Sequence, residues 1–396
     1  MRKAMSQSET IPSAPATFLP FSQPMFGDEE LAEVADSMRS GWLTRGPKTQ
    51  RFEDMFREYV GAAAAVGVNS ATAGLHLACV CLGIGAGDEV ITTPITYCAT
   101  PNEIEHAGAT PVFVDVDPVT FLIDPKKIEA AITPRTKAIM PVHVYGQSCD
   151  MDAIMDLAKR HDLRVIEDAA HAIETTFKDR KIGTIGDFTV FSFYPTKNIS
   201  TGEGGMMTTM DAELGDYAKR MSMHGNSKDA WKRYGSSGFA HYSLIERGYK
   251  YHMFDLLAAI GLAQFPKLEP WHAIRTQLWD RYDERLRDVP GVRAIPDVMP
   301  GRHARHLYVI EVDEAVSVTS RDALMDYLQQ HNVGVGIHYY GMHLQPYYRE
   351  KYGLTPEMFP VATRASQQML SLPLYPKMTL ADVDAVVSVL RTGLHG

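Results

Sequence analysis

One lysine lies in a stretch whose residue types suit covalent chemistry. Lys197 follows an apolar run at 188–193 and a turn-forming Pro195, and three glycines lie just behind it in the segment 200–205. Glycine has no side chain, so its backbone can approach a bulky group closely. A lysine held beside a desolvated pocket loses its proton more readily and can attack a carbonyl carbon to form a Schiff base. The alternative is a surface hairpin that carries a solvated lysine.

A second segment has the composition of a phosphate site. An apolar run ends at Val68, and Ser70, Ala71 and Thr72 open the helical pattern that follows. Free N–H groups and the positive end of the helix dipole bind anions at such a terminus, and the two hydroxyl groups add donors. Ordinary capping of the helix explains the same residues.

A carboxylate and a histidine stand at the end of another apolar run. Asp168 can hydrogen-bond a ring nitrogen and keep it protonated, and His171, three residues on, can pack against or hydrogen-bond the same ring. A helix cap and a satisfied core histidine are the alternatives for these two residues.

Two further residues follow strand-like runs. Tyr97 can stack on a flat heterocycle, and Ser192 can reach the phosphate held by residues 70–72. A core aromatic and a locally bonded serine are the alternatives. Together the segments supply a phosphate cradle, a carboxylate, an aromatic cover and an amine. Pyridoxal 5′-phosphate (PLP) requires all four, since its ring withdraws electrons only while its nitrogen stays protonated.

The elements that must position these residues are strands that alternate with helices. Near-continuous Val, Ile and Phe runs are typical of strands covered on both faces, and the helical stretches between them predict βαβ units and a largely parallel sheet. Ligands bind beyond the carboxyl ends of such strands. The expected strands are 64–68, 89–93, 111–116, 138–144, 164–167, 188–193 and 206–209.

The length of 396 residues favours two domains. Residues 1–17 are expected to form a flexible tail, 18–265 a large PLP-binding domain, and 266–396 a smaller α+β domain. Within them we expect an amphipathic helix at 28–41, a loop at 235–242, and a helical region at 254–287 that is interrupted near Pro266 and Pro270.

Composition limits the partners and the compartment. The net charge of −9 disfavours nucleic acid. The four cysteines show no CxxC spacing, no signal peptide is recognisable, and no apolar segment is long enough to span a membrane. A soluble cytoplasmic protein is therefore expected.

Seven motifs resemble the DegT/DnrJ/EryC1/StrS family of PLP-dependent sugar aminotransferases, from about residue 18 to the C-terminus. The motifs occupy residues 41–47, 69–73, 87–91, 167–171, 192–197, 202–205 and 248–251. The resemblance implies a fold-type I transaminase that works as a homodimer with active sites at the subunit interface.

The resemblance also implies a role for each site residue. Lys197 would carry the cofactor as a Schiff base, Asp168 would pair with the ring nitrogen, and His171 would lie against the ring. The remaining roles are phosphate binding by Ser70, Ala71, Thr72 and Ser192, a cation at the phosphate from the neighbouring subunit's Lys250, and substrate binding around Thr44 and His338.

The resemblance to enzymes that aminate a UDP-4-keto-pentose for lipid A modification is carried by residues 134–138 and 347–350. It implies transfer of an amino group, with L-glutamate as donor, to a nucleotide-linked 4-keto-sugar. Two departures blur the substrate assignment: Glu174 stands where relatives usually have glycine, and residues 252–254 differ from the usual pattern.

Four other functions compete with this one. A non-catalytic PLP-binding regulator of similar fold stays open, and a PLP-dependent sugar dehydratase is disfavoured because Lys197 stands where such relatives have histidine. A Rossmann oxidoreductase lacks its GxGxxG motif. A metal-dependent hydrolase is disfavoured because the spacing of the histidines matches no ligand motif; these histidines are His143, His171, His338 and His343.

Overall fold

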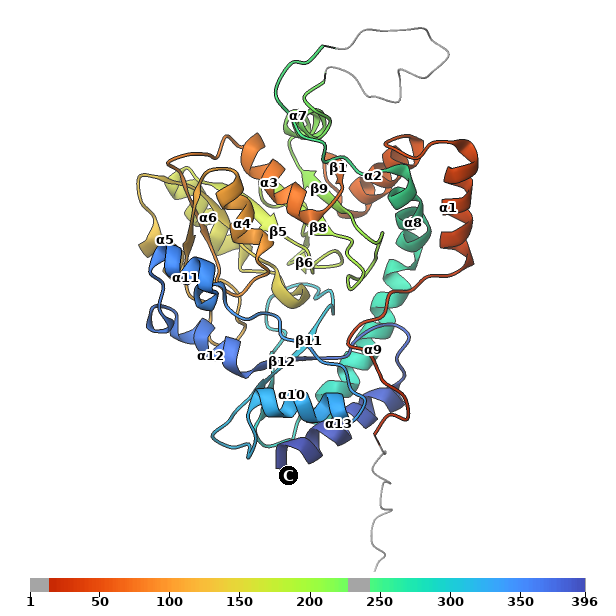
Figure 1. The fold of residues 1–396 in the computed structure, drawn as a ribbon. Coiled ribbons are helices and arrows are strands. Elements are labelled where there is room, and N and C mark those ends of the chain that lie inside the picture. The colour runs from red at the N-terminus through yellow and green to blue at the C-terminus, as the bar shows by residue number, and fades with distance from the viewer. Residues whose placement is uncertain (1–13, 227–242, 396) are drawn as a thin grey trace, which may run out of the picture.

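The structure is a computed structural model that describes residues 14–226 and 243–395 (Figure 1). The expectations for residues 1–13, as part of a tail, and for 235–242, as a loop, fall outside the described residues. Pro15, near the end of the expected tail, accepts a hydrogen bond from the Asn332 side chain through its carbonyl oxygen at 3.0 Å.

A seven-stranded sheet forms the centre of the larger part of the molecule. Its order is β1-β9-β8-β5-β4-β2-β3, and every neighbouring pair is parallel except those that involve β9. The predicted α/β fold with a mainly parallel sheet is thereby confirmed. The strands are β1 (Ala64–Val68), β2 (Glu89–Thr92), β3 (Thr110–Phe113), β4 (Thr136–Met140), β5 (Arg164–Asp168), β8 (Phe188–Ser192) and β9 (Gly205–Thr209).

Helices cover both faces of this sheet, as the buried Val, Ile and Phe runs of its strands require. Two separate apolar clusters fill the two interfaces. One face packs against α3 (Ala71–Cys81), α4 (Ala99–His106) and α7 (Ala212–Ser222). The other packs against α2 (Pro47–Val60), α5 (Pro125–Ala131), α6 (Met151–His161) and α8 (Asp255–Gln264).

The first helix, α1 (Asp28–Ser40), packs beside α8. Its expected apolar face does not lie in the core of this chain, because Leu31 and Met38 are 68% and 66% exposed. The side chains that it buries are instead Glu30 and Ser37.

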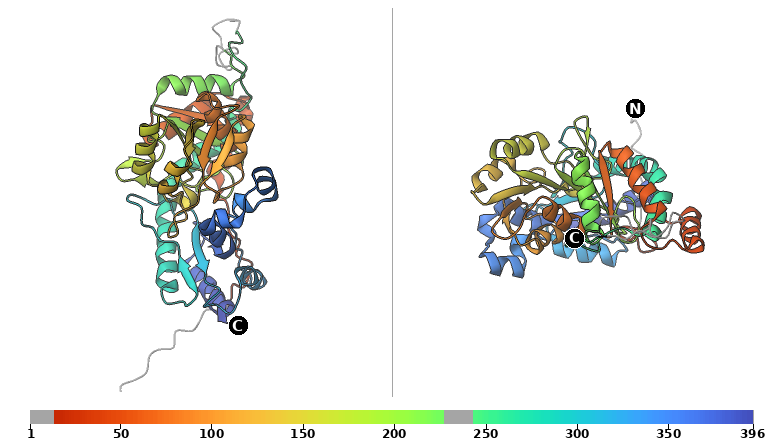
Figure 2. Two further views of the ribbon diagram at one scale, coloured as in Figure 1. Left: turned by 90° about the vertical axis from the view of Figure 1, so that its left-hand side faces the viewer. Right: turned by 90° about the horizontal axis from the view of Figure 1, so that it is seen from above.

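A smaller three-stranded antiparallel sheet lies at the other end of the molecule, below the large sheet in Figure 1 and in the left view of Figure 2. It has an apolar core of its own, which it shares with three helices. The elements are β10 (Val292–Ala294), β11 (Tyr308–Val312) and β12 (Met369–Leu372), with α9 (Leu268–Leu286), α10 (Arg321–Gln330) and α13 (Leu380–His395).

Two helices of the C-terminal region contact the large sheet's side of the molecule. In α11 (Pro346–Tyr352) the Tyr348 ring lies 5.5 Å from that of Phe113. At the start of α12 (Pro360–Gln368), Asp115 accepts the N–H groups of Val361 and Ala362 at 3.0 and 2.9 Å. The domain boundary expected between residues 265 and 266 falls within the 3-10 turn Phe265–Lys267 and stays a prediction.

One expected break is wrong. The helical region changes geometry at Pro266, which lies in that 3-10 turn, but α9 runs through Pro270 without interruption. Pro270 is the third residue of α9, where a backbone N–H has no partner within the helix, so proline costs little there.

Candidate active site

Nine predicted site residues line a single cavity of about 420 Å³ at the ends of β1, β5 and β8. Such a volume lies in the range of small-molecule and cofactor sites. The nine residues are Ser70, Ala71, Thr72, Tyr97, Asp168, His171, Ser192, Lys197 and His338.

Lys197 follows a tight turn after β8, in which its backbone N–H donates to the Tyr194 carbonyl at 2.9 Å. Its side chain enters the cavity, and its Nζ atom has no hydrogen-bond partner among the described residues. Burial lowers the pKa of Lys197 to about 8, although the nearby Asp168 carboxylate opposes the shift. The side chain therefore supplies an amine that a modest rise in pH makes nucleophilic.

Asp168 ends β5, and protein donors fix its carboxylate. The Thr100 hydroxyl donates to Oδ2 at 2.7 Å, and the Ala170 N–H donates to Oδ1 at 3.1 Å. Burial raises the pKa of Asp168, while these hydrogen bonds and the charge of Lys197 oppose that rise. Each oxygen keeps a lone pair, so a protonated ring nitrogen in the cavity can be paired with the carboxylate.

His171 is held as a neutral ring. Its Nδ1 accepts the Tyr145 N–H at 3.2 Å, and its Nε2 lies 3.0 Å from the Tyr339 hydroxyl. Because a backbone N–H only donates, Nδ1 carries no proton and Nε2–H donates to Tyr339. Burial, reinforced by Lys197, keeps the pKa of His171 well below its usual value.

The N-terminus of α3 fits an anion. The Ser70 hydroxyl caps the helix by accepting the Ala73 N–H at 3.1 Å, so the structural alternative for Ser70 also holds. The N–H groups of Ala71 and Thr72 have no partner among the described residues. A Cβ on Gly205 would lie 2.8 Å from the Ala71 nitrogen, so glycine is needed for β9 to begin so close to this terminus.

Several lining residues were missed by sequence reasoning. His306 stands two residues before β11, Tyr339 follows His338 directly, and both reach the cavity from the C-terminal part of the chain. The only sequence signal was their place directly beside two expected β runs of the smaller domain, 307–312 and 333–338. The other missed residues include Phe21, Tyr194, Glu203 and Leu307.

Two predicted residues do not line the cavity. The Thr44 hydroxyl lies 3.4 Å from Nε2 of His252, and the Lys250 carbonyl accepts from the Asn69 side chain at 3.4 Å. Thr44 and Lys250 are both exposed, and their segments lie side by side through the contact between Thr44 and His252. Because Lys250 was expected to act on the neighbouring subunit's site, a single chain leaves its role a prediction.

The residues present fit PLP on two independent observations. Free N–H donors at the start of α3 suit a phosphate, and an oriented carboxylate opposite a partly deprotonated lysine suits a protonated ring that bears an aldehyde. Fold and site together define a PLP-dependent aminotransferase.

The family model of the DegT/DnrJ/EryC1/StrS aminotransferases matches residues 24–391. The chain belongs to this family, and its cofactor is pyridoxal phosphate. Because the match spans nearly the whole chain, the family expected from the seven motifs is confirmed.

Three relatives illustrate the similarity. The spore coat polysaccharide biosynthesis protein SpsC of Bacillus subtilis is 50% identical over 380 residues, which cover 96% of this chain and 98% of SpsC. The putative sugar aminotransferase Spr1654 of Streptococcus pneumoniae, in its PMP form, has a TM-score of 0.89 at 33% identity and covers 95% and 98% of the two chains. DesI, solved in the presence of its TDP-sugar product, has a TM-score of 0.85 at 30% identity and covers 96% and 94%.

Metal sites, disulfides and membrane-spanning helices also bear on the kind of protein. Residues 14–226 and 243–395 hold no cluster of three or more His, Cys, Asp or Glu side chains suited to a metal ion. All four cysteines are free thiols. Within the same ranges no helix combines the length and apolarity that crossing a membrane requires.

Proposed function

We propose that this protein transfers an amino group from an amino acid, such as L-glutamate, to position 4 of a nucleotide-linked keto-sugar. The observation that carries the proposal is the convergence of Lys197, Asp168 and the start of α3 on one cavity, in a sugar aminotransferase family member. The TDP-sugar product named for DesI supports a nucleotide-linked substrate. The name of SpsC supports a surface polysaccharide as destination, and lipopolysaccharide is the kind proposed here. The reaction is proposed to take place in the cytoplasm.

Each site residue has its own proposed role in the reaction. Bound PLP supplies an aldehyde for the amino group and an electron-withdrawing ring. Lys197 would hold the cofactor through its amine and, when that amine is free, would serve as the base that moves a proton from the donor carbon. Asp168 keeps the ring nitrogen protonated, His171 lies against the ring, and Tyr97 covers it. Ser192 and the N–H groups of residues 71 and 72 hold the phosphate.

We also propose a homodimer with shared sites. Leu31 and Met38 of α1 and Leu43, which directly precedes Thr44 in the chain, are exposed large apolar side chains, and such side chains favour a partner surface. Thr44 and His338 are proposed to bind the sugar nucleotide, and Lys250 the phosphate of the neighbouring subunit's cofactor. Mixed dimers of Lys197→Ala with Lys250→Ala should then regain activity, because one of their two sites is intact.

The test of the substrate is a panel of nucleotide-linked keto-sugars with L-glutamate as donor. We expect one 4-keto-sugar to gain an amino group, seen as the matching mass change, while 2-oxoglutarate accumulates in equal amount. Lys197→Ala should lose multiple turnovers. A wild-type protein that binds PLP but aminates none of the sugars would instead favour a regulatory protein.

A further inference from the structure

Glu174 is a buried acid that the proposed chemistry does not use. It is fully buried, and its two carboxylate oxygens have different partners. Oε1 is paired with Arg275, which α9 supplies and which is itself 2% exposed. Oε2 accepts the side-chain N–H of Asn198 at 2.7 Å. Since Asn198 directly follows Lys197 in the chain, this buried ion pair reaches the residue beside the reactive amine.

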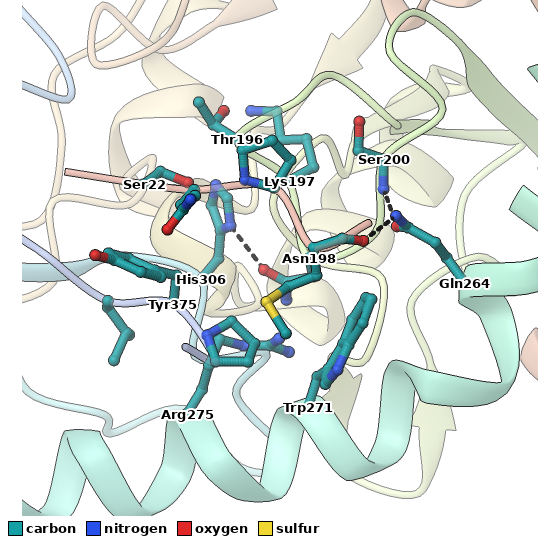
Figure 3. A pocket seen from close by; sticks show the side chains of 15 residues that line it. Ser22, Thr196, Lys197, Asn198, Ser200, Gln264, Trp271, Arg275, His306 and Tyr375 are labelled. Atoms are coloured by element: carbon teal, nitrogen blue, oxygen red, sulfur yellow. Dashed lines mark hydrogen bonds between the residues drawn. The ribbon is translucent and has the colours of Figure 1, made fainter. Parts of the chain in front are cut away.

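The orientation of the Asn198 amide follows from its partners. Its Nδ2 donates to Glu174 and to the Ala304 carbonyl, at 2.7 and 3.1 Å. The reverse orientation would place Oδ1 against two oxygen acceptors, so it is excluded. The oxygen Oδ1 therefore faces Nδ1 of His306, at 2.8 Å, and must accept its proton. Figure 3 shows Asn198 between His306 and the helix that carries Arg275.

The His306 ring lies between two cavities and lines both of them. Together with Thr196 and Lys197 it lines both the large cavity and a second, water-sized cavity of about 20 Å³ behind it. Its centroid lies 4.4 Å from that of His171. With Nδ1 protonated, the neutral ring leaves Nε2 with a free lone pair, and Nε2 has no hydrogen-bond partner among the described residues.

We propose that Glu174 is a positioning residue which, through Asn198, fixes His306 in the Nδ1–H form, so that the unpartnered Nε2 is available to accept a hydrogen bond when the reaction releases the Lys197 amine and that amine turns toward it within the shared cavity. The inference rests on the proposed function, since only a lysine that is repeatedly released needs a resting partner. No partner for Nζ is otherwise present among the described residues. His306 thereby holds the amine near the reacting atoms between the two halves of the reaction.

The charged and titratable surroundings of His306 keep its ring neutral. Burial lowers the pKa of His306 well below its usual value, and the positive charges of Lys197 and Arg275, with His338 and His303, act in the same direction. A neutral ring can accept from an ammonium group, whereas a charged one would repel it.

The first test reads the tautomer directly. Full-length protein with ¹⁵N-labelled histidine is loaded with pyridoxamine phosphate, a form that leaves the lysine unattached, and the His306 signals are assigned by their loss in His306→Gln. We expect a protonated Nδ1 and an unprotonated Nε2 near neutral pH. A protonated Nε2 in the wild-type protein would overturn the proposal, whatever the variants do.

The Glu174→Gln variant should shift the tautomer of His306. Arg275 requires an acceptor, so the new amide turns its oxygen to Arg275 and its NH₂ to Asn198. That NH₂ faces Nδ2 of Asn198, and only the Ala304 carbonyl still favours the original orientation, so we expect Asn198 to flip in a measurable fraction of the molecules and to shift the His306 proton to Nε2 in that fraction. Glu269→Gln is the control. Glu269 lies on α9, as Arg275 does, and its substitution removes an ion pair with Arg302 without touching Asn198. An unchanged tautomer in folded Glu174→Gln contradicts the proposal.

A second measurement follows the lysine itself. Competitive acylation across pH, read by mass spectrometry of the Lys197 peptide, gives the pKa of the amine. His306→Leu removes the acceptor and should lower that pKa by about one unit, whereas His306→Gln, which keeps an acceptor, should change it less. If the pKa of Lys197 is the same in the wild-type protein, His306→Leu and His306→Gln, the hydrogen bond between Lys197 and His306 is refuted. Both readouts stay informative if no keto-sugar is aminated, so a failed proposed function is recognised separately.

Discussion

At the scale of single residues, the protonation state of the Lys197 amine controls when the site can react. With the pKa of Lys197 lowered to about 8, only a minor fraction of the amine is neutral at pH 7. The neutral fraction rises tenfold per pH unit below pH 8 and levels off above it.

The rate at which cofactor-free protein captures PLP should therefore rise with pH and reach a plateau just above pH 8. The measurement is the absorbance change on rapid mixing over pH 6–10, with free lysine as the control. Because an unperturbed lysine has a pKa of about 10.4, a rate that still rises tenfold from pH 9 to 10 would contradict the buried amine.

A second residue-scale prediction concerns the orientation of Asp168. Thr100→Val keeps the side-chain shape but removes the hydroxyl that donates to Oδ2. A hydrogen bond to a charged group contributes about 1.5 kcal/mol, so we expect roughly a tenfold loss of kcat. Thr96→Val removes only the neighbour of Thr100, which lies 2.7 Å from it, and should cost less. Equal activity in Thr100→Val and wild type would show that the carboxylate needs no such support.

The site residues that the sequence predicted are marked by local pattern, whereas the missed ones depend on partners far away in the chain. Lys197 and Asp168 have unusual chemistry and stand directly after apolar runs, so local pattern marks them. Thr100 acquires its role from a partner 68 residues away, and His306 from Asn198, which is 108 residues away. No local pattern contains such pairings. Only the packing of the elements creates them.

At the scale of elements, strands were easier to predict than the contacts between helix ends. The expected run at 64–68 coincides with β1, and that at 188–193 with β8 to within one residue, because strands that helices cover on both faces are continuous apolar runs. The cap of α2 was not visible. Gly46, at its N-cap, has no side chain, and the carboxylate that caps it comes from α8.

That carboxylate belongs to Asp255, which is buried. It accepts the N–H groups of Gly46, Lys48 and Thr49 at 2.7, 3.1 and 2.9 Å, and also the Thr49 hydroxyl at 2.6 Å. Asp255→Ala leaves these buried donors unpaired, so we expect the free energy of unfolding to fall by about 3 kcal/mol.

Urea unfolding measures the effect of Asp255→Ala, and Asp211→Ala is the control. Asp211 caps α7 alone, through the exposed N–H groups of Glu213 and Leu214, so its loss should cost about 1 kcal/mol. Equal losses in the two variants would mean that the contact between α8 and α2 adds nothing beyond an ordinary cap.

At the scale of the whole molecule, alternating strands and helices predicted the large sheet, and the α+β pattern of residues 266–396 predicted a smaller unit. The pattern did not predict how the smaller unit completes the cavity. His306, His338 and Tyr339 reach it from beside the three-stranded sheet, because its packing below the large sheet brings their loops to the strand ends (Figure 1).

This arrangement buries many neutral histidines, which makes the fold sensitive to acid. Burial keeps the pKa values of His171, His303 and His306 well below the usual range and lowers the pKa of His338 to about 3. In the unfolded chain these rings take up protons near pH 6.5, so below that pH the unfolded state binds more protons than the folded state. Stability is therefore complete above pH 6.5 and declines as the pH falls.

Each buried histidine should cost up to about 1.4 kcal/mol of stability per pH unit below 6.5. The melting temperature of the cofactor-free protein should therefore fall steadily from pH 7 to pH 5. Ordinary carboxylates titrate below this window, and the raised pKa values of the buried acids Asp168 and Glu174 change the stability in the opposite direction, so a fall in melting temperature reports the histidines. His303 does not line the cavity, so it can be replaced without changing the site. His303→Asn should make the melting temperature fall less steeply with decreasing pH, by about the contribution of one histidine. A melting temperature that stays constant over this range would mean that these rings titrate as they do in the unfolded chain.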